Sequence, residues 1–140
     1  MNAEGPALPP FERLSFERYF HWADQMRKHF EQRDYRDELP AHWEPYMAYW
    51  YGSLYAVIEG WRELRLSDPG IDRLLEAEQN VGLLRRYRNC AFHFQRGYFD
   101  SRVVDVWASD EAVPWIRSLH REFTRWFEEQ QIIYARKSTE

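Results

Sequence analysis

The feature that most constrains the fold is the spacing of the large apolar side chains, which recur every three or four residues along most of the chain. This is the period of an α-helix with one buried face, whereas a half-buried strand alternates at every second residue. The chain also has only 6 glycines and 7 prolines in 140 residues, too few for the many turns of a sheet protein. The sequence therefore predicts an all-α fold.

The spacing divides the chain into four main helices and one short one. The main helices are expected over residues 11–33, over about 20 residues that begin near Pro45 and end before Ser67, over residues 80–96 and over residues 111–135. Asp68 and Pro69 are typical of a helix start, so a short helix is expected over residues 69–78. Residues 97–109 are expected to be an irregular connection. The predicted fold is an up-and-down helical bundle with four main helices plus a short extra helix.

The inward face of each main helix follows from the same period. The residues expected to face the core are Phe16, Phe20, Ala23, Met26 and Phe30 in the first helix, Trp43, Met47, Trp50, Leu54, Ile58 and Trp61 in the second, Leu83, Leu84, Tyr87, Cys90, Ala91 and Phe94 in the third, and Trp115, Ile116, Leu119, Phe123, Phe127 and Ile133 in the last. Aromatic residues make up 18% of the chain, so even this short sequence can bury a large core.

The length favours one domain, expected over residues 11–135, between tails at residues 1–10 and 136–140. No apolar run approaches the roughly 18 residues of a membrane helix, and residues 1–10 lack the features of a signal peptide, so a cytoplasmic protein without a membrane partner is expected. Cys90 is the only cysteine, and its place on the inward face predicts an inert core thiol. The five histidines form no helical metal pair, so neither a metal nor a cofactor is expected.

The net charge is −4, but the charges are unevenly distributed. The 21 residues between Glu78 and Asp100 contain no acidic side chain, yet they include Arg85, Arg86, Arg88 and Arg96. Arginine suits bidentate contact with phosphate groups, so this basic segment favours RNA or a nucleotide as partner. A GC-rich genome would give the same preference for arginine, and that explanation stays open.

These arginines share one face of the helix predicted over residues 80–96, together with Asn89 and His93. Asn89 precedes His93 by one helical turn, so their side chains are expected to meet. The face is either a solvated polar surface with an incidental histidine or a binding site for an anion. The absence of a neighbouring acid to neutralise the arginines favours the anion site.

The string Arg88-Asn89-Cys90-Ala91-Phe92-His93 resembles the signature of the HEPN superfamily. In that family an arginine is followed at once by Asn, Asp or His, and a histidine comes after four to six intervening residues. The expected setting, late in the third main helix of a small all-α bundle, is also similar to that family. A second string, from Arg36 to His42, fits the same pattern, but Pro40 argues against a helix through it.

The resemblance implies a metal-independent endoribonuclease that acts as a homodimer. His93 would take the proton of a ribose 2′-hydroxyl, and Arg88 would stabilise the charge of the phosphorane. Asn89 would fix the histidine tautomer or bind phosphate. The phosphates on either side would be bound by Arg85, Arg86 and Arg96. Such a protein would be a toxin or defence component, with an antitoxin protein as a further partner.

Two other interpretations stay open. The chain could be a non-catalytic, dimeric HEPN-like module that binds a nucleotide, an RNA or a protein, or a plain helical interaction protein whose motif is accidental. A homodimer is expected because the first two helices carry more apolar residues than one buried face needs. The residues concerned include Tyr19, Trp22, Tyr46, Tyr49, Tyr51 and Tyr55, for which core closure or partner packing is favoured over stacking on RNA bases.

Overall fold

The computed structural model describes residues 10–32, 39–98 and 100–138. Within these residues the chain forms six α-helices and no strand, so the predicted all-α class is confirmed. The helices are α1 (Pro10–Glu31), α2 (Pro40–Glu63), α3 (Pro69–Leu75), α4 (Glu78–Ala91), α5 (Ser101–Ala108) and α6 (Ala112–Ser138).

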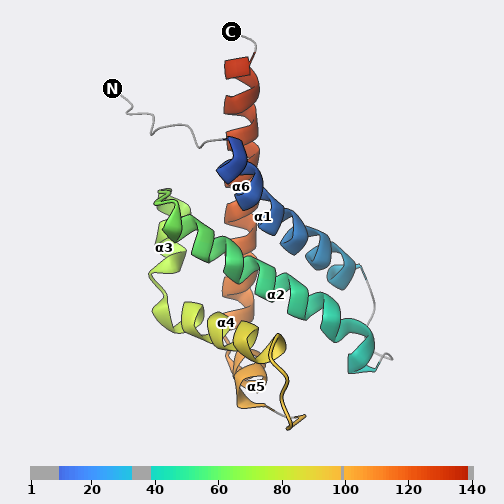
Figure 1. Cartoon of the computed structure of the whole chain (residues 1–140). Helices are drawn as coiled ribbons and strands as arrows, with labels where there is room; N and C mark the ends of the chain where they lie inside the picture. Colours follow the sequence, from blue (N-terminus) through green and yellow to red (C-terminus); the bar gives the residue numbers. More distant parts are fainter. Residues whose placement is uncertain (1–9, 33–38, 99, 139–140) are drawn as a thin grey trace.

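Helix α2 lies in the middle of the molecule (Figure 1). It runs antiparallel to α1 on one side and packs against α4 on the other. The long helix α6 crosses behind α2 and contacts α3, α5, α1 and α4, and its C-terminal end projects beyond the other helices. The short helix α3 connects α2 to α4, and the short helix α5 connects α4 to α6. The core therefore forms where α2 faces α6.

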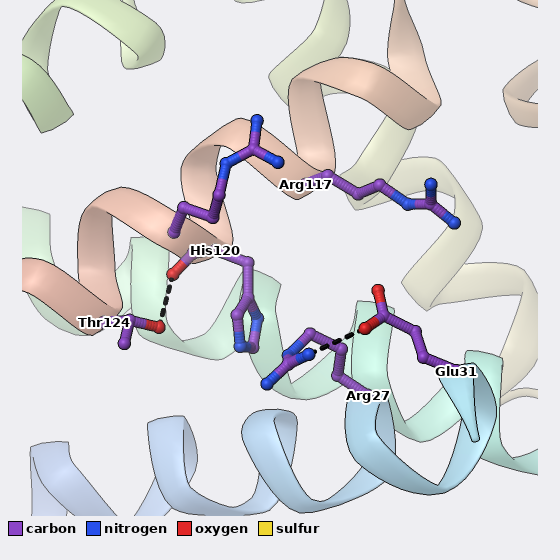
Figure 2. Close-up of a pocket in the computed structure, with 6 residues that line it drawn as sticks. Arg27, Glu31, Arg117, His120 and Thr124 are labelled. Carbon is purple, nitrogen blue, oxygen red and sulfur yellow. Dashed lines mark hydrogen bonds and ion pairs between the residues drawn. The ribbon is translucent and has the colours of Figure 1, made fainter.

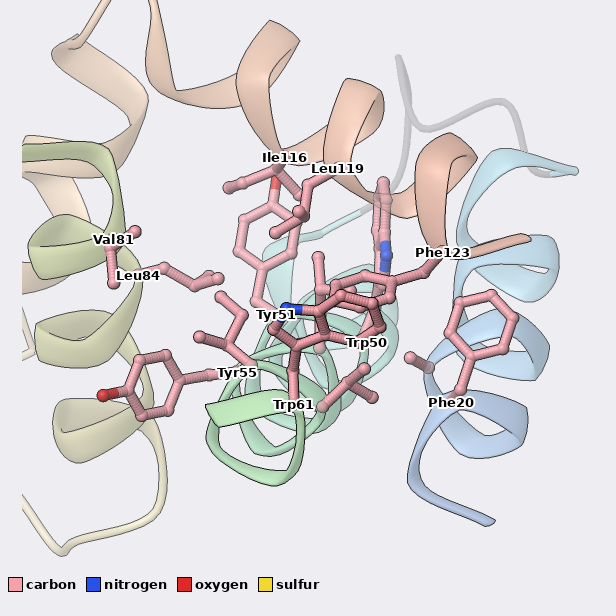
Figure 3. Packing of buried hydrophobic residues seen from close by; sticks show 14 of the residues in the cluster. Phe20, Trp50, Tyr51, Tyr55, Trp61, Val81, Leu84, Ile116, Leu119 and Phe123 are labelled. Carbon is pink, nitrogen blue, oxygen red and sulfur yellow. The ribbon is translucent and has the colours of Figure 1, made fainter. Parts of the chain in front are cut away.

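Aromatic side chains dominate this core (Figure 3). Trp50, Trp61 and Phe123 are almost fully buried, and the Phe20 and Phe127 rings stack with centroids 4.7 Å apart. Burying one such side chain stabilises the fold by about 2–3 kcal/mol, so the aromatic residues supply much of the driving force.

Most of the predicted inward positions are confirmed as buried. Met26, Phe30, Trp43 and Leu83 are only partly buried at the edge of the core. Ala91 and Phe94 are exposed, Phe94 to 92%, so for these two residues the prediction was wrong. The side chain of Ile133 lies outside the described residues.

Capping residues set several helix ends. The Asp68 carboxylate accepts a hydrogen bond from the Ile71 N–H at 3.0 Å, and Pro69 is the first residue of α3, as predicted. The Ser109 hydroxyl accepts from the Ala112 N–H at 3.1 Å where α6 begins. Each of these contacts satisfies a backbone donor that the helix itself leaves unpaired.

Helix α2 begins and ends in ways that the sequence only partly indicated. It starts at Pro40, five residues before Pro45, and Pro40 takes the first-turn position expected for the later proline. At its other end, the Leu66 N–H donates to the Trp61 carbonyl and the Arg65 N–H donates to the Arg62 carbonyl. Arg65 has a φ of 53°, so an arginine occupies the left-handed position of a Schellman motif that glycine usually fills.

Two expectations about the segment after α4 were wrong. Helix α4 ends at Ala91 rather than near residue 96, and residues 101–108 form α5 rather than an irregular connection. The Asp100 carboxylate caps α5 by accepting from the Arg102 N–H at 2.9 Å, and Val106 is fully buried beneath it. Because β-branched valines are poor helix formers, this capped and buried turn owes its stability to tertiary packing.

At the chain ends, residues 1–9 of the expected N-terminal tail lie outside the described residues. Helix α6 continues to Ser138, three residues beyond its expected end. None of the helices in the described ranges combines the length and the apolar character needed to cross a lipid bilayer.

Candidate functional site

Helix α4 separates its apolar and polar residues as predicted up to Asn89. Leu84, Tyr87 and Cys90 are buried against the core. On the opposite side Arg85 and Arg86 are exposed, and Arg88 and Asn89 are partly buried. Burial raises the pKa of the Cys90 thiol, which agrees with the prediction of an inert core cysteine.

The Arg88 guanidinium is held on three sides. Its Nη1 donates to Oε1 of Glu59 on α2 at 2.5 Å, and its Nε donates to Oδ1 of Asn89 at 3.1 Å. Its Cζ lies 4.5 Å from the centroid of the Tyr55 ring, within the range of a cation–π contact. Within the described residues its Nη2 has no hydrogen-bond partner, so this nitrogen can still donate hydrogen bonds to an anion.

His93 lies outside the helix that was expected to carry it. Helix α4 ends at Ala91, and Phe92 is its C-cap, so His93 is the second residue beyond the helix and is exposed. Its backbone carbonyl accepts from the Gln95 side chain at 3.0 Å. The predicted contact between Asn89 and His93 is wrong, because the helical period stops before His93 and the Asn89 oxygen accepts from Arg88 instead.

Phe92 fixes the start of the segment that carries His93. Its ring packs edge-to-face on Tyr49 of α2, with centroids 5.3 Å apart. It also lies directly over Gly52, where the Cβ of any other residue would overlap the ring. Gly52 therefore lets the chain after α4 approach the backbone of α2 closely.

The end of the same segment is fixed by an arginine. Nη2 of Arg102 donates to Oε1 of Gln95 at 2.8 Å and to Oδ2 of Asp100 at 2.9 Å. The Arg102 guanidinium and backbone N–H keep the pKa of Asp100 well below its usual value. Sequence reasoning missed this Gln95–Asp100–Arg102 network. An Asp two residues before an Arg was the only available signal, and that spacing is common.

The remaining arginines differ in what surrounds them. Nη2 of Arg86 pairs with Oδ2 of Asp105 on α5 at 2.8 Å. The expectation that no acid neutralises this basic segment was therefore wrong, because Glu59 and Asp105 reach it from α2 and α5. Arg85 and Arg96 are exposed, and no acid among the described residues pairs with them.

Exposed aromatic residues lie close to His93 in the sequence. Phe94 is 92% exposed and Tyr98 is 76% exposed, and Phe92 is about half exposed. Three tyrosines of α2 have one of two other roles, and Tyr46 stacks on His29 of α1 with ring centroids 5.5 Å apart. Tyr51 and Tyr55 are buried and close the core, whereas Tyr49 is exposed and supports Phe92.

A second polar site, which sequence reasoning missed, lies between α1 and α6 (Figure 2). It is an open pocket of about 290 Å³ whose lining residues are Arg27, Glu31, Arg117, His120, Arg121 and Thr124. The available signal was the spacing of Arg117, His120, Arg121 and Thr124, which places all four on one face of a helix. None of the residues predicted for the site at α4 lines this pocket.

No protein-family model, curated protein or solved structure matches the chain significantly. In the part of the chain that the structure describes, no group of three or more His, Cys, Asp or Glu side chains is arranged to hold a metal ion.

Proposed function

We propose that the protein is a metal-independent, HEPN-like endoribonuclease that cleaves RNA by attack of a ribose 2′-hydroxyl. The observation that carries the proposal is that Arg88 is held in place with free hydrogen-bond donors, while the imidazole of His93 is free of hydrogen bonds within the described residues. Arg88 is fixed by Glu59, Asn89 and Tyr55 yet keeps free donors, and the exposed His93 imidazole has no hydrogen-bond partner among the described residues. A fixed cation and an uncommitted base are the two groups that this chemistry requires.

In the proposed reaction, the His93 imidazole takes the proton of the 2′-hydroxyl. The 2′-oxygen then attacks the adjacent phosphorus, the bond to the 5′-oxygen breaks, and that oxygen leaves with a proton. The products are a 2′,3′-cyclic phosphate and a 5′-hydroxyl. Histidine suits this step because it exchanges a proton readily near neutral pH.

Arg88 stabilises the extra negative charge on the phosphorane. Its Nε and one Nη1 hydrogen are occupied, which leaves three of its five hydrogens for phosphoryl oxygens. Asn89 positions this guanidinium and does not touch the base. Arg85 and Arg96 have no acidic partner among the described residues, so they are better placed than Arg86 to bind the flanking phosphates.

The proposed active form is a homodimer of HEPN-like bundles, with α1, α2, α4 and α6 as the four main helices of each copy. Its support is the exposure of large apolar side chains, Phe11 to 86%, Leu14 to 61% and Trp22 to 48% on α1, and Phe94 beside His93. A second copy would bring a second His93 that can protonate the leaving 5′-oxygen. Such an enzyme would act on cytoplasmic RNA as a toxin or defence component, restrained by an antitoxin protein.

One observation favours a second candidate function, a non-catalytic HEPN-like module that binds RNA or a nucleotide. The Glu59 carboxylate already neutralises part of the Arg88 charge. This pairing reduces the ability of Arg88 to stabilise a transition state but still permits phosphate binding through the free donors.

Cleavage of a single-stranded RNA in EDTA tests the proposal. We expect cleavage by the wild type, about 10²–10⁴-fold less by His93→Ala, and no change in His21→Ala, an exposed histidine on α1 that serves as the matched control. A single-stranded DNA of the same sequence should bind but remain intact. Cleavage that survives His93→Ala, or that EDTA abolishes, would contradict this mechanism. RNA binding without any cleavage would establish the binding module instead.

A further inference from the structure

We propose that the pocket between α1 and α6 is a binding site for a phosphate group, with Arg117 and Arg121 as the residues that hold it. The site is separate from the one at α4, and the inference does not depend on the ribonuclease proposal. Figure 2 shows Arg117 on α6 across the pocket from Arg27 and Glu31 on α1, with the His120 ring between the two helices.

The charges around the pocket are not balanced within the described residues. Arg27 pairs with Asp24 at 3.0 Å and with Glu31 at 2.7 Å, and Lys28 pairs with Asp24 at 3.1 Å. The acids at this end of α1 are therefore already engaged by bases of the same helix. Any negative charge for the arginines of α6 must come from elsewhere.

Arg117 and Arg121 are those arginines. They are exposed, one helical turn apart on α6, and no acid among the described residues pairs with either of them. Among the described residues, the one hydrogen bond that these guanidiniums make runs from Nη2 of Arg121 to the neutral Ser118 hydroxyl at 3.2 Å. Two like charges at this spacing repel one another and destabilise the helix slightly. A bound anion would reduce that repulsion.

The floor of the pocket is rigid and uncharged. His120 is 3% exposed, its Nδ1 accepts from the Trp50 indole N–H at 3.1 Å, and its Nε2 lies 3.0 Å from Oδ1 of Asp24. Because Nδ1 is an acceptor, the proton must be on Nε2, and the ring is neutral. His120 therefore supplies a fixed wall, and the excess positive charge at the pocket belongs to the two arginines.

A phosphate fits this charge better than a carboxylate does. Its two negative charges match the two unpaired guanidiniums, and its oxygens accept the forked donors of arginine in pairs. The pocket volume of about 290 Å³ leaves room for more than a bare ion. A neighbouring pocket of about 520 Å³ shares Thr124 as a wall, so an organic group attached to the phosphate would have space to extend into it.

Binding of inorganic phosphate and of AMP to the full chain at low salt tests the inference, by calorimetry and by NMR of the backbone amides. We expect saturable binding that shifts the amides of residues 117–124 and 27–31. Tighter binding of AMP would identify a phosphate monoester as the ligand, and tighter binding of inorganic phosphate would identify the free ion.

The variants locate the site. Arg117→Gln and Arg121→Gln should each weaken binding about tenfold, because each removes a charge-assisted contact. Arg73→Gln, an exposed arginine on α3, is the matched control and should bind like the wild type. The inference is overturned if the wild type binds neither probe, if both α6 variants bind as tightly as the wild type, or if Arg88→Gln alone abolishes binding.

Discussion

The Glu59 carboxylate on α2 accepts a hydrogen bond from the Arg88 guanidinium on α4 at 2.5 Å, although the two residues are 29 positions apart in the sequence. Glu59 is about half exposed and Arg88 about one third exposed, so solvent weakens the pair. Its main effect is therefore to orient Arg88 over the Tyr55 ring, and its contribution to stability is small.

Replacing Glu59 tests this positioning role. In Glu59→Gln the amide oxygen can still accept from Arg88, but the negative charge is gone. We expect RNA to bind a few times more tightly at low salt and the free energy of unfolding to change by less than about 1 kcal/mol. Glu59→Ala also removes the acceptor, so it should lower the rate of RNA cleavage at saturating RNA. A cleavage rate in Glu59→Ala equal to that of the wild type would show that Arg88 needs no positioning by Glu59.

The substitution Gly52→Ala should reduce RNA cleavage while leaving the stability of the fold nearly unchanged. A methyl group at this position would overlap the Phe92 ring, so the ring and the segment that carries His93 must move. Alanine is a better helix former than glycine by about 1 kcal/mol, which offsets the lost ring contact. We expect little change in the midpoint of urea unfolding but a clear loss of RNA cleavage. Gly82→Ala on α4, where a methyl group meets no other atom within 4 Å, is the matched control and should cleave normally.

Arg65→Gly should stabilise the protein by roughly 0.5–1 kcal/mol. Arg65 has a φ of 53°, which strains any residue with a Cβ but not glycine. The measurement is the free energy of urea unfolding. Arg62→Gly, in the last turn of the same helix, should instead destabilise the fold because glycine is a poor helix former. The explanation fails if Arg65→Gly is as destabilising as Arg62→Gly.

The buried His120 should make stability depend on pH. Burial lowers the pKa of His120 below its ordinary value of 6.5, even though Asp24 opposes this by accepting a hydrogen bond from the ring. The unfolded chain therefore binds a proton more readily than the folded protein does. The stabilisation is complete above about pH 6.5 and is lost as the pH falls below that value.

Urea unfolding at pH 7.5 and pH 5.0 measures this effect. The free energy of unfolding of the wild type should fall between the two pH values, and that of His120→Gln should fall less, since glutamine can bond to Trp50 and Asp24 without titrating. An equal fall in both proteins would assign the pH dependence to other groups.

Asp24 should make the free energy of unfolding depend on pH in a second, lower range. Burial opposes ionisation of Asp24, but hydrogen bonds from His120, Arg27 and Lys28 outweigh it and lower the Asp24 pKa from 3.8 to about 2. This contribution is present above pH 3.8 and is lost as the pH falls toward 2. Asp24→Asn should unfold with a smaller dependence on pH across that range.

Local patterns in the sequence were sufficient to predict the fold class and most of the core. The three-to-four-residue spacing identified Phe20, Trp50, Leu84 and Phe123 as inward residues, and all four are buried. The start of α3 at Asp68 and Pro69 was also predictable. These features depend on residues within one or two helical turns of each other, and such information is fully contained in the sequence.

The end of α4 and the surroundings of its arginines were decided by tertiary contacts. Phe92 leaves the helix to pack over Gly52, which places His93 in the following segment and removes it from the face of Asn89. The period of the sequence continues past this point, so it could not indicate where the helix stops.

The amino-acid sequence by itself therefore determined that this chain is helical and which faces of most of its helices are buried. Only the tertiary structure decided that Arg88 is paired with Glu59, that Arg86 is paired with Asp105, and that Arg117 and Arg121 line a pocket together with Arg27 and Glu31 of α1. The physical reason is distance along the chain. A helical face is set by neighbouring residues, whereas the partner of a charge is set by how separate helices pack against one another.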